Sequence, residues 1–287
     1  MLAHKSDPKR IDFDKNDYYV QPKLDGIRCY ITKDGMFTRN HKPIVSAPHV
    51  FEGLQDFFEE YGDAVILDGE LYNHEYKHNF NKIVSLVRKT KPTQEDLKES
   101  SLKVEFHCYD FYPVGDPGMI FSDRMEFLKR EVFNNLAVVG VDTHEVYNDQ
   151  QAKSFNSVWL EAGYEGSMIR QDAEYQPKRS WYLQKVKTFV DEEFKIVGYV
   201  EQMKRTVGGQ KLEEPIPTGM LGKFIMEMKD GRTFGAPPGK GYDAALKTSM
   251  WKRRDSYIGK EATVEFFEYT PDGIPRFPKW KGVRDYE

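Results

Sequence analysis

The stretch Val20-Gln21-Pro22-Lys23-Leu24-Asp25-Gly26-Ile27-Arg28 constrains the fold of this chain more than any other part of its sequence. It places a lysine, an acid, a glycine and an arginine between two apolar, β-prone runs, residues 18–20 and 29–31. Strands on both sides of a glycine turn predict that Lys23 lies at a strand end and points into a cleft. A lysine held there can attack a phosphorus atom, while Arg28 steadies the anion. The pattern is short, and an exposed hairpin with solvated charges explains it equally well.

The chain has 287 residues, of which 39% are hydrophobic and 31% charged, so it can form one large domain or two ordinary ones. It has no apolar run near the roughly 20 residues that span a bilayer, and its N-terminus lacks the apolar core of a secretory signal. Cys29 and Cys108 lie in apolar, strand-like runs, which favours core residues in a reducing compartment over a disulfide or a metal site. We therefore predict a soluble protein without a membrane contact, in the cytoplasm, or in the host cytoplasm if its source is a virus.

The overall charge argues against a protein that coats nucleic acid. There are 42 Lys and Arg residues against 46 Asp and Glu, for a net charge of −4. Any contact with nucleic acid must therefore come from separating the two signs on the surface.

Apolar periodicity predicts strands interleaved with helices up to residue 189, which indicates an α+β domain of mixed sheets. The clearest strand is 102–112, where Val104, Phe106, Cys108 and Asp110 share one face. The other predicted strands are 18–20, 29–31, 36–40, 64–67, 141–147, 165–170 and 182–190, the helices are 51–61, 80–87, 123–140 and 149–162, and the loops are 1–17 and 89–101.

The last part of the chain, residues 190–287, has a different pattern. Short strand-like runs at 193–200, 223–229 and 262–269 surround one helical pattern at 242–251. This combination predicts a small Greek-key β-barrel of the oligonucleotide-binding (OB-fold) kind. Residues 206–218, with two glycines and two prolines, are predicted as a long mobile loop.

Several short motifs then follow one another in a fixed order. They are Lys23-Leu24-Asp25-Gly26-Ile27-Arg28, Thr38-Arg39-Asn40, Asp68-Gly69-Glu70-Leu71, Tyr109-Asp110, Glu165-Gly166-Ser167-Met168-Ile169-Arg170, Lys185-Val186-Lys187, Arg276-Phe277-Pro278 and Arg284-Asp285. This ordered set resembles the covalent nucleotidyltransferase superfamily, and specifically the small ATP-dependent DNA ligases of the viral or phage kind. The resemblance covers nearly the whole chain. It implies an ATP-grasp-like adenylation domain over residues 1–189, followed by an OB-fold domain over residues 190–287.

The resemblance also implies roles for individual residues around the nucleotide. Lys23 would take AMP from ATP as a phosphoramidate, and Arg28 would contact the nucleotide sugar or the phosphate of the nicked strand. Arg39 would bind the terminal phosphate at the nick, Glu70 the ribose, and Tyr109 would stack on the adenine. The further implied contacts with ATP are Gln21, where the family often has a glutamate that meets the adenine, Arg170, and Lys185 and Lys187, which would grip the α-phosphate.

A divalent metal and the second domain complete the implied site. Glu70 and Glu165 would hold Mg²⁺ or Mn²⁺, since carboxylates are hard oxygen ligands. Arg276 and Arg284 of the barrel would orient the pyrophosphate leaving group. The family usually has a lysine soon after the second of these arginines, and here the chain continues Asp285-Tyr286-Glu287, so the role of Arg284 is the less secure one.

Basic residues outside the motifs indicate how nucleic acid is held. We predict that a nicked DNA duplex is bound by a monomer through the phosphate contacts Arg39, Lys204, Arg205, Lys252 and Arg253. Without the resemblance, the charges of Lys204, Arg205, Lys252 and Arg253 are explained equally well as an ordinary solvated surface.

The reaction itself requires an unprotonated lysine. A free lysine has a pKa of about 10.4, so roughly one molecule in two thousand is a nucleophile at neutral pH. Nearby cations destabilise the ammonium form, and we expect Lys185, Lys187, Arg170 and the metal to supply them.

Other enzymes and one other class of protein share parts of this pattern. An RNA ligase or an mRNA-capping guanylyltransferase would also carry the lysine motif. A non-catalytic OB-fold protein that binds nucleic acid would use the barrel alone and would never carry covalent AMP. Taken alone, these residues also have ordinary explanations. Tyr109 could be an aromatic residue of the core, and Lys185 and Lys187 could form an exposed basic face.

Overall fold

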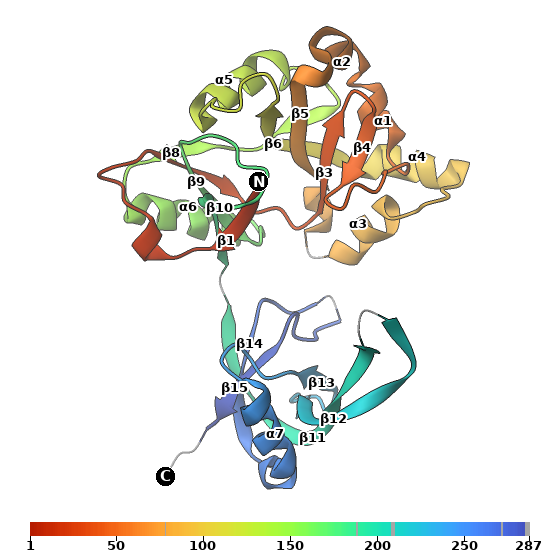
Figure 1. The fold of residues 1–287 in the computed structure, drawn as a ribbon, viewed down its shortest axis with the longest axis vertical. Helices are drawn as coiled ribbons and strands as arrows, with labels where there is room; N and C mark the ends of the chain where they lie inside the picture. The colour runs from red at the N-terminus through yellow and green to blue at the C-terminus, as the bar shows by residue number, and fades with distance from the viewer. Residues whose placement is uncertain (78, 188, 208–209, 271, 285–287) are drawn as a thin grey trace. The chain divides into compact units, whose positions relative to one another are not determined.

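The computed structural model describes residues 1–77, 79–187, 189–207, 210–270 and 272–284 (Figure 1). The chain divides into two compact units, Met1–Lys187 and Thr188–Glu287, and each is described by itself. Within the described residues, no helix is both long enough and apolar enough to cross a membrane. Short 3-10 helices connect some elements, at Pro8–Arg10, Gly62–Ala64, His74–Tyr76 and Arg254–Tyr257.

The first unit contains two five-stranded sheets. One has the order β1-β10-β9-β2-β8. Its strands are β1 (Leu2–Lys5), β2 (Tyr18–Pro22), β8 (His144–Val146), β9 (Gly166–Gln171) and β10 (Arg179–Lys187). Helix α6 (Asp149–Glu161) covers it, because Ala152 and Trp159 pack against Tyr18, Val20 and Ile169.

The other sheet of this unit has the order β4-β3-β5-β6-β7. Its strands are β3 (Ile27–Thr32), β4 (Gly35–Thr38), β5 (Val65–Tyr72), β6 (Glu105–Pro113) and β7 (Val138–Gly140). The helices packed around it are α1 (Pro48–Glu52), α2 (Gln55–Tyr61), α3 (Phe80–Val87), α4 (Gln94–Lys103) and α5 (Phe121–Glu131) (Figure 1). Side chains such as Leu67, Phe106 and Leu128 form the largest apolar core of the unit.

The turn from β2 to β3 carries Lys23 from one sheet to the other, and Gly26 makes this turn possible. A Cβ atom on Gly26 would lie 2.4 Å from the carbonyl oxygen of Leu71 and 2.8 Å from Cγ of Glu70. Only glycine therefore lets the turn pass directly over β5. This close approach brings Lys23 and Glu70 to the same place.

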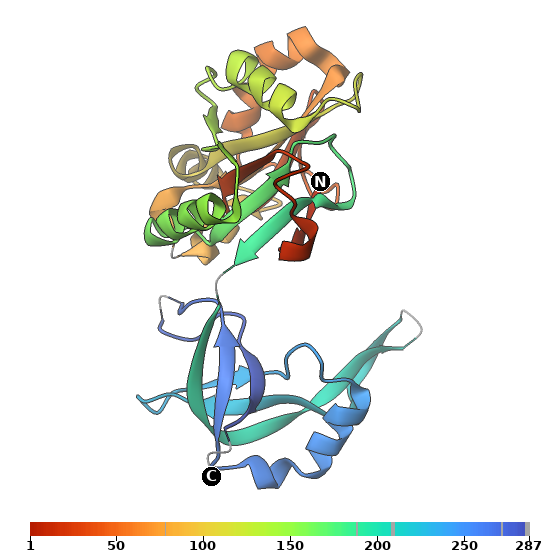
Figure 2. The same ribbon diagram turned by 90° about the vertical axis from the view of Figure 1, so that its left-hand side faces the viewer.

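The second unit is built on the sheet β13-β12-β11-β14-β15, with helix α7 (Ala244–Lys252) beside it (Figure 2). Its strands are β11 (Val190–Val207), β12 (Gln210–Glu227), β13 (Thr233–Ala236), β14 (Glu261–Phe266) and β15 (Lys279–Val283). Among the described residues of this unit the strand ladder does not close into a barrel, and an isolated bridge from Pro238 to Trp280 joins its two edges. Trp280 also fills the core against Phe224.

Two segments that were predicted as loops are regular structure. Residues 89–101 contain most of α4, which opens with a capping box in which Thr93 and Asp96 bond each other's backbone N–H groups. Its sequence is almost entirely polar, so apolar periodicity could not reveal it. Of residues 206–218, residues 208 and 209 lie outside the described residues, and the others belong to strands β11 and β12, where Lys204 pairs with Ile216 and Met203 pairs with Pro217.

The predicted bounds of two further segments were wrong. Helix α5 begins at Phe121 and ends at Glu131, so Asp123 lies in its first turn instead of capping it, and Gly140 ends strand β7. Residues 1–17, predicted as a loop, contain β1, which pairs in parallel with β10 and so completes the sheet behind Lys23.

Candidate active site

Lys23 and Glu165 are held face to face by the backbone. The N–H of Lys23 donates to the carbonyl of Gly166 (2.9 Å), and the N–H of Glu165 donates to the carbonyl of Lys23 (3.1 Å). The ammonium of Lys23 forms an ion pair with one carboxylate oxygen of Glu165, and Lys187 forms an ion pair with the other. Two lysines from different motifs therefore share one buried carboxylate.

The sequence predicted cations near Lys23 and gave Glu165 the role of a metal ligand, so the direct ion pair between Lys23 and Glu165 was not expected. A carboxylate in contact with an ammonium group stabilises its charged form. The amine of Lys23 must therefore give up a proton before it can act as a nucleophile, and Glu165 is the carboxylate in contact with it.

A pocket of about 210 Å³ opens beside Lys23. Most of the predicted nucleotide-binding residues line it, namely Gln21, Lys23, Arg28, Arg39, Glu70, Tyr109, Arg170 and Lys185. Lys187 does not line this pocket and reaches the site through Glu165. Sequence reasoning gave no role to Met168, Arg179 and Leu183, which also line the pocket. Met168 lies inside the motif 165–170, but its type did not point to a contact, and neither period nor motif marks Arg179 and Leu183 as different from ordinary strand residues.

Two charged groups in the pocket have altered ionisation. Burial raises the pKa of Glu70 to about 7, against the opposing effect of Lys23 and Arg28. Burial also lowers the pKa of Lys185, and the cations Lys23, Arg179 and Arg39 lower it further. The pocket therefore carries an excess of positive charge, and a bound anion would reduce the repulsion between its cations.

Arg28 is held in place by the carboxylate of Asp68. Its guanidinium donates two hydrogen bonds to the Asp68 carboxylate, of 2.9 and 2.7 Å, and one of 2.6 Å to the carbonyl of Met1. Tyr175 also donates its hydroxyl hydrogen to Asp68 (2.8 Å). Burial would raise the pKa of Asp68, but Arg28 and the nearby α-amino group hold it below its usual range.

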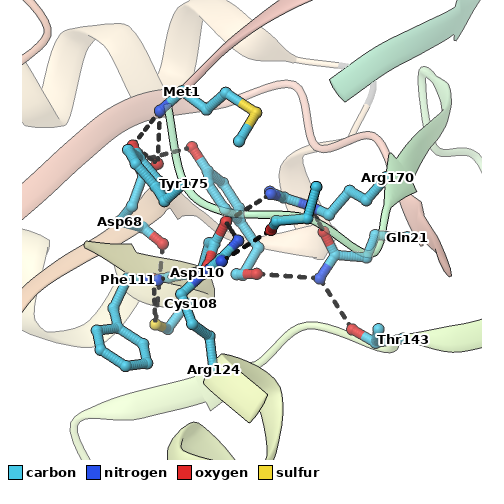
Figure 3. A network of polar contacts seen from close by, with 12 residues as sticks. Met1, Gln21, Asp68, Cys108, Asp110, Phe111, Arg124, Thr143, Arg170 and Tyr175 are labelled. Atoms are coloured by element: carbon cyan, nitrogen blue, oxygen red, sulfur yellow. Dashed lines mark hydrogen bonds and ion pairs between the residues drawn. The ribbon is translucent and has the colours of Figure 1, made fainter. Parts of the chain in front are cut away.

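A second buried carboxylate, Asp110, binds Arg124 and Arg170, and Arg170 lines the pocket (Figure 3). Arg124 donates to both of its oxygens (2.8 and 3.2 Å), and Arg170 donates to one of them (2.7 Å). Arg170 was predicted to contact the nucleotide, yet its guanidinium points to Asp110 and lies 5.3 Å from the ring centroid of Tyr109. Bound to Asp110, Arg170 supports the wall of the pocket.

The amide of Gln21 is likewise occupied by protein groups. Its oxygen accepts a hydrogen bond from Arg170 (2.6 Å), and its nitrogen donates to the carbonyl of Tyr109 (3.1 Å) and to Oγ1 of Thr143 (2.9 Å) (Figure 3). One hydrogen bond of the amide nitrogen therefore holds the strand that carries Tyr109, and the other holds Thr143. Gln21 shapes the floor of the pocket.

Neither Asp68 nor Asp110 was given a role from the sequence, although both lie in the ordered motifs. Asp110 was placed on the buried face of its strand with Phe106 and Cys108, and a charged residue in that position requires a partner. A charge predicted on a buried strand face was the sign in the sequence that Asp110 must have a partner. The partners, Arg124 and Arg170, are distant in the sequence and could not be identified from it.

The carboxylates of Glu70 and Glu165 both lie near Lys23, as expected for a metal site. No group of three His, Cys, Asp or Glu side chains with metal-binding geometry occurs in the described part of the chain. Mg²⁺ is commonly bound by one or two carboxylates, with waters and substrate phosphates as its other ligands. The two glutamates fit such a partial site.

The remaining predicted residues lie in the second unit. Lys204 and Arg205 are exposed on β11, and Lys252 and Arg253 are exposed where α7 ends. Arg276 pairs with Glu268 (2.7 Å) and its guanidinium lies 4.9 Å from the ring centroid of Phe277. Arg284 forms an ion pair with Glu193. Asp285 lies outside the described residues.

Both units of the chain match models of known protein families. Residues 1–187 match the model of the ATP dependent DNA ligase domain, and residues 217–284 match the DNA ligase OB-like domain. The chain belongs to the ATP-dependent DNA ligase family. Membership confirms the predicted α+β fold class, a nucleotidyltransferase domain followed by an OB-like domain. Ligases of this family use ATP as the adenylate donor and act on DNA.

Individual ligases resemble the chain over nearly its whole length. A DNA ligase of African swine fever virus (isolate Tick/South Africa/Pretoriuskop Pr4/1996) is 24% identical over 97% of this chain and 66% of the viral protein, so the chain spans 66% of that relative. A solved Lig E DNA ligase is 25% identical, with a TM-score of 0.74, and the match covers 99% of this chain and 98% of that one. The ATP-dependent DNA ligase of bacteriophage T7, solved in complex with ATP, shares the fold at 17% identity and a TM-score of 0.55, over 98% and 97% of the two chains.

Proposed function

We propose that this chain is an ATP-dependent DNA ligase that seals nicks between a 5′-phosphate and a 3′-hydroxyl in duplex DNA. The observation that carries the proposal is the position of Lys23. It lies beside a pocket lined by Arg39, Glu70, Tyr109 and Lys185, and it is held by a carboxylate that it shares with Lys187. An amine among phosphate-binding cations and next to an aromatic ring suits the transfer of an adenylate.

In the first step, Nζ of Lys23 attacks the α-phosphorus of ATP. A P–N bond forms, the bond from the α-phosphorus to the bridging oxygen breaks, and pyrophosphate leaves. Glu165, which already contacts Nζ, is placed to receive the proton that the amine loses. Lys185 and Lys187 stabilise the charge that builds on the phosphate, and Tyr109 stacks on the adenine. Arg276 orients the pyrophosphate.

In the second step, an oxygen of the DNA 5′-phosphate attacks the same phosphorus and releases Lys23, which leaves AMP on the DNA. In the third step, the 3′-hydroxyl attacks the 5′-phosphorus, forms the phosphodiester and releases AMP. Arg39, exposed at the mouth of the pocket, is placed to hold the 5′-phosphate, and Arg28 supports it from the pocket wall.

A divalent cation, Mg²⁺ or Mn²⁺, would be held by Glu70 and Glu165. Bound there, it would neutralise phosphate charge. The chain's own residues bind and orient the nucleotide: Lys185 and Lys187 meet the α-phosphate, and Glu70 accepts a hydrogen bond from the ribose.

The second unit contributes contacts with the DNA backbone. We assign these to the exposed side chains Lys204, Arg205, Lys252 and Arg253, which need only general phosphate contact and no base reading. We further propose that the chain acts as a monomer on a nicked duplex. Its location in the cytoplasm, or in a host cytoplasm, stays a prediction.

Intact-protein mass spectrometry tests the proposal directly. Incubation with ATP and magnesium should add the mass of one AMP, located on Lys23 after proteolysis, and GTP should add nothing. Lys23→Ala should carry no adduct yet still seal a nick that is already adenylylated, whereas Lys33→Ala, an exposed lysine of the same unit, should behave like the unmodified sequence. An adduct formed only from GTP would indicate a capping guanylyltransferase. The absence of any adduct would indicate a protein that only binds nucleic acid.

A further inference from the structure

Helix α6 ends in a Schellman motif directly before Glu165. Gly163 adopts the left-handed conformation that this motif requires (φ 93°), and the N–H of Tyr164 donates to the carbonyl of Trp159 (2.9 Å). The C-cap residue is Ala162. The carbonyl of a C-cap residue lies beyond the last hydrogen bond of its helix, so it must find a donor elsewhere.

The donors to the carbonyl of Ala162 come from the other sheet of the unit. Nε2 of His74 donates to it (3.1 Å), and Nζ of Lys77 donates to it as well (2.9 Å). Because a carbonyl oxygen can only accept, Nε2 of His74 carries a hydrogen. Both side chains follow β5, the strand that carries Glu70. The end of β5 is therefore tied to the turn that leads to Glu165.

The imidazole of His74 is also held by two tyrosines. Its Nδ1 lies 2.7 Å from the hydroxyl of buried Tyr72, and its ring centroid lies 4.3 Å from that of Tyr164. Tyr72 and Tyr164 belong to a small apolar cluster that includes Leu24, the residue after Lys23. These contacts fix the orientation of the imidazole between the two sheets.

Glu165 is thus held from two directions. On one side, main-chain hydrogen bonds join it and the residue after it to Lys23. On the other side, the turn at residues 162–164 is tied to the second sheet by His74 and Lys77. His74 does not line the pocket beside Lys23, so it can act on the reaction only through position. A displacement of about 1 Å at a reacting group can lower a rate roughly a hundredfold.

We propose that His74 is a positioning residue for the transfer of the adenylate. By holding the carbonyl of Ala162 and the ring of Tyr164, it fixes the turn from which Glu165 projects towards Lys23, and so it speeds the reaction of the lysine with ATP. The inference rests on the proposed function, in which Glu165 receives the proton of the attacking amine. Binding of ATP should depend little on His74, because the imidazole lies outside the pocket.

A purely structural role for the same residue makes different predictions. Donors at the C-terminus of a helix stabilise that helix, and His74 would do no more than this for α6. Its loss would then lower the stability of the protein and leave the rate of the folded molecules unchanged.

The test compares single-turnover self-adenylylation by His74→Gln and His74→Asn. Glutamine places its amide nitrogen near the position of Nε2 and can still donate to Ala162, whereas asparagine reaches only the position of Nδ1. At saturating ATP, His74→Asn should form the lysyl-adenylate about tenfold more slowly than the original sequence, and His74→Gln should stay within about threefold of it. The KM for ATP should change by less than about threefold in both variants.

His49 provides a matched control. Its Nε2 lies 2.9 Å from a backbone carbonyl of the same unit, that of Val104, and it does not line the pocket. His49→Asn should lower the urea midpoint without slowing adenylylation by the folded protein. The proposal is overturned if His74→Asn reacts at the original rate, if His74→Gln is as slow as His74→Asn, if His49→Asn is slowed equally, or if the loss appears in the KM alone.

A double-mutant cycle shows whether the effect passes through Glu165. In a Glu165→Gln background, His74→Asn should cause no further loss of rate, because the carboxylate that it positions is gone. Losses that multiply would mean that His74 acts on another group and would contradict the proposal. If Glu165→Gln forms no adenylate, the comparison of His74→Gln with His74→Asn decides alone.

These outcomes are separate from those that test ligation. An original sequence that never takes up AMP contradicts the proposed function. An original sequence that takes up AMP on Lys23, with His74 variants that do so equally fast, contradicts only the role of His74.

Discussion

Asp110 and Arg124 form an ion pair that is closed to water, with 0% and 1% of their side chains exposed. Arg124 donates from Nε and from a terminal nitrogen to the two carboxylate oxygens, and its other terminal nitrogen donates to the carbonyls of Met119 and Ala173. Arg170 makes a third bond to Asp110 from the opposite side. One carboxylate thus fixes two arginines, of which Arg170 lines the pocket.

Replacement of Asp110 by asparagine should therefore be strongly destabilising. It leaves two buried guanidinium groups without a negative partner, and breaking a buried pair in this way costs about 3–5 kcal/mol. Urea unfolding of the Asp110→Asn variant measures this loss. Asp63→Asn, which removes the partner of exposed Lys33, is the control and should leave the urea midpoint in place. Similar midpoints for the two variants would show that Asp110 is not the anchor of this network.

Glu70 should make the stability of the protein depend on pH. Its pKa rises from 4.5 to about 7 in the folded chain, so between these values the folded state holds a proton that the unfolded state has lost. The free energy of unfolding therefore falls as the pH rises through this window. Because part of Glu70 is open to the pocket, water reduces the effect to about 2 kcal/mol or less.

The Glu70→Gln variant isolates this contribution, since glutamine cannot ionise. Urea unfolding at about pH 5 and about pH 8 should show a smaller fall in stability for Glu70→Gln than for the original sequence. Glu95→Gln, an exposed residue of α4, should retain the full fall. If the stability of Glu70→Gln falls between the two pH values as much as that of the original sequence, then Glu70 is already ionised at the lower pH.

Tyr109 should act through its ring and not through its hydroxyl. One face of the ring lies against the guanidinium of Arg170, and the hydroxyl is 3.4 Å from Oδ1 of Asp68, which is long for a hydrogen bond. Tyr109→Ala should raise the KM for ATP in self-adenylylation roughly ten- to a hundredfold, the effect of losing one stacking contact. Tyr109→Phe should stay within about twofold of the original. Equal losses in the two variants would transfer the role to the hydroxyl.

Local pattern was enough to place β2, the strand that leads to Lys23, and α6, the helix that covers its sheet. The apolar, β-prone residues of β2 and the alternation of β6 are properties of neighbouring residues, which a single sequence displays. The same reasoning failed for α4, whose stability comes from a polar capping box, and for the β11–β12 hairpin, where cross-strand pairing outweighs the turn-forming residues of the segment.

Contacts between residues far apart in the sequence limit how much of the site could be predicted. Lys23 and Glu165 were both recognised from their motifs, but their ion pair joins residues 142 positions apart. The same holds for Arg170, which motif order placed near the nucleotide and which the fold turns towards Asp110 and Gln21. Sequence order identified the parts of the pocket, and only the packing of two sheets shows which of them touch.

Lys185 should be a residue that the protein keeps for function at the expense of stability. Burial and the nearby cations Lys23, Arg179 and Arg39 lower its pKa, so its ammonium group is unfavourable in the free pocket until an anion arrives. Lys185→Met keeps the length of the side chain and removes the charge. It should raise the urea midpoint while it reduces self-adenylylation at least tenfold, because the α-phosphate loses a charged contact worth about 1.4 kcal/mol or more. Lys129→Met, an exposed lysine, should change neither quantity. A Lys185→Met protein that is less stable than the original, or that forms the adenylate at the original rate, would contradict this account of the pocket.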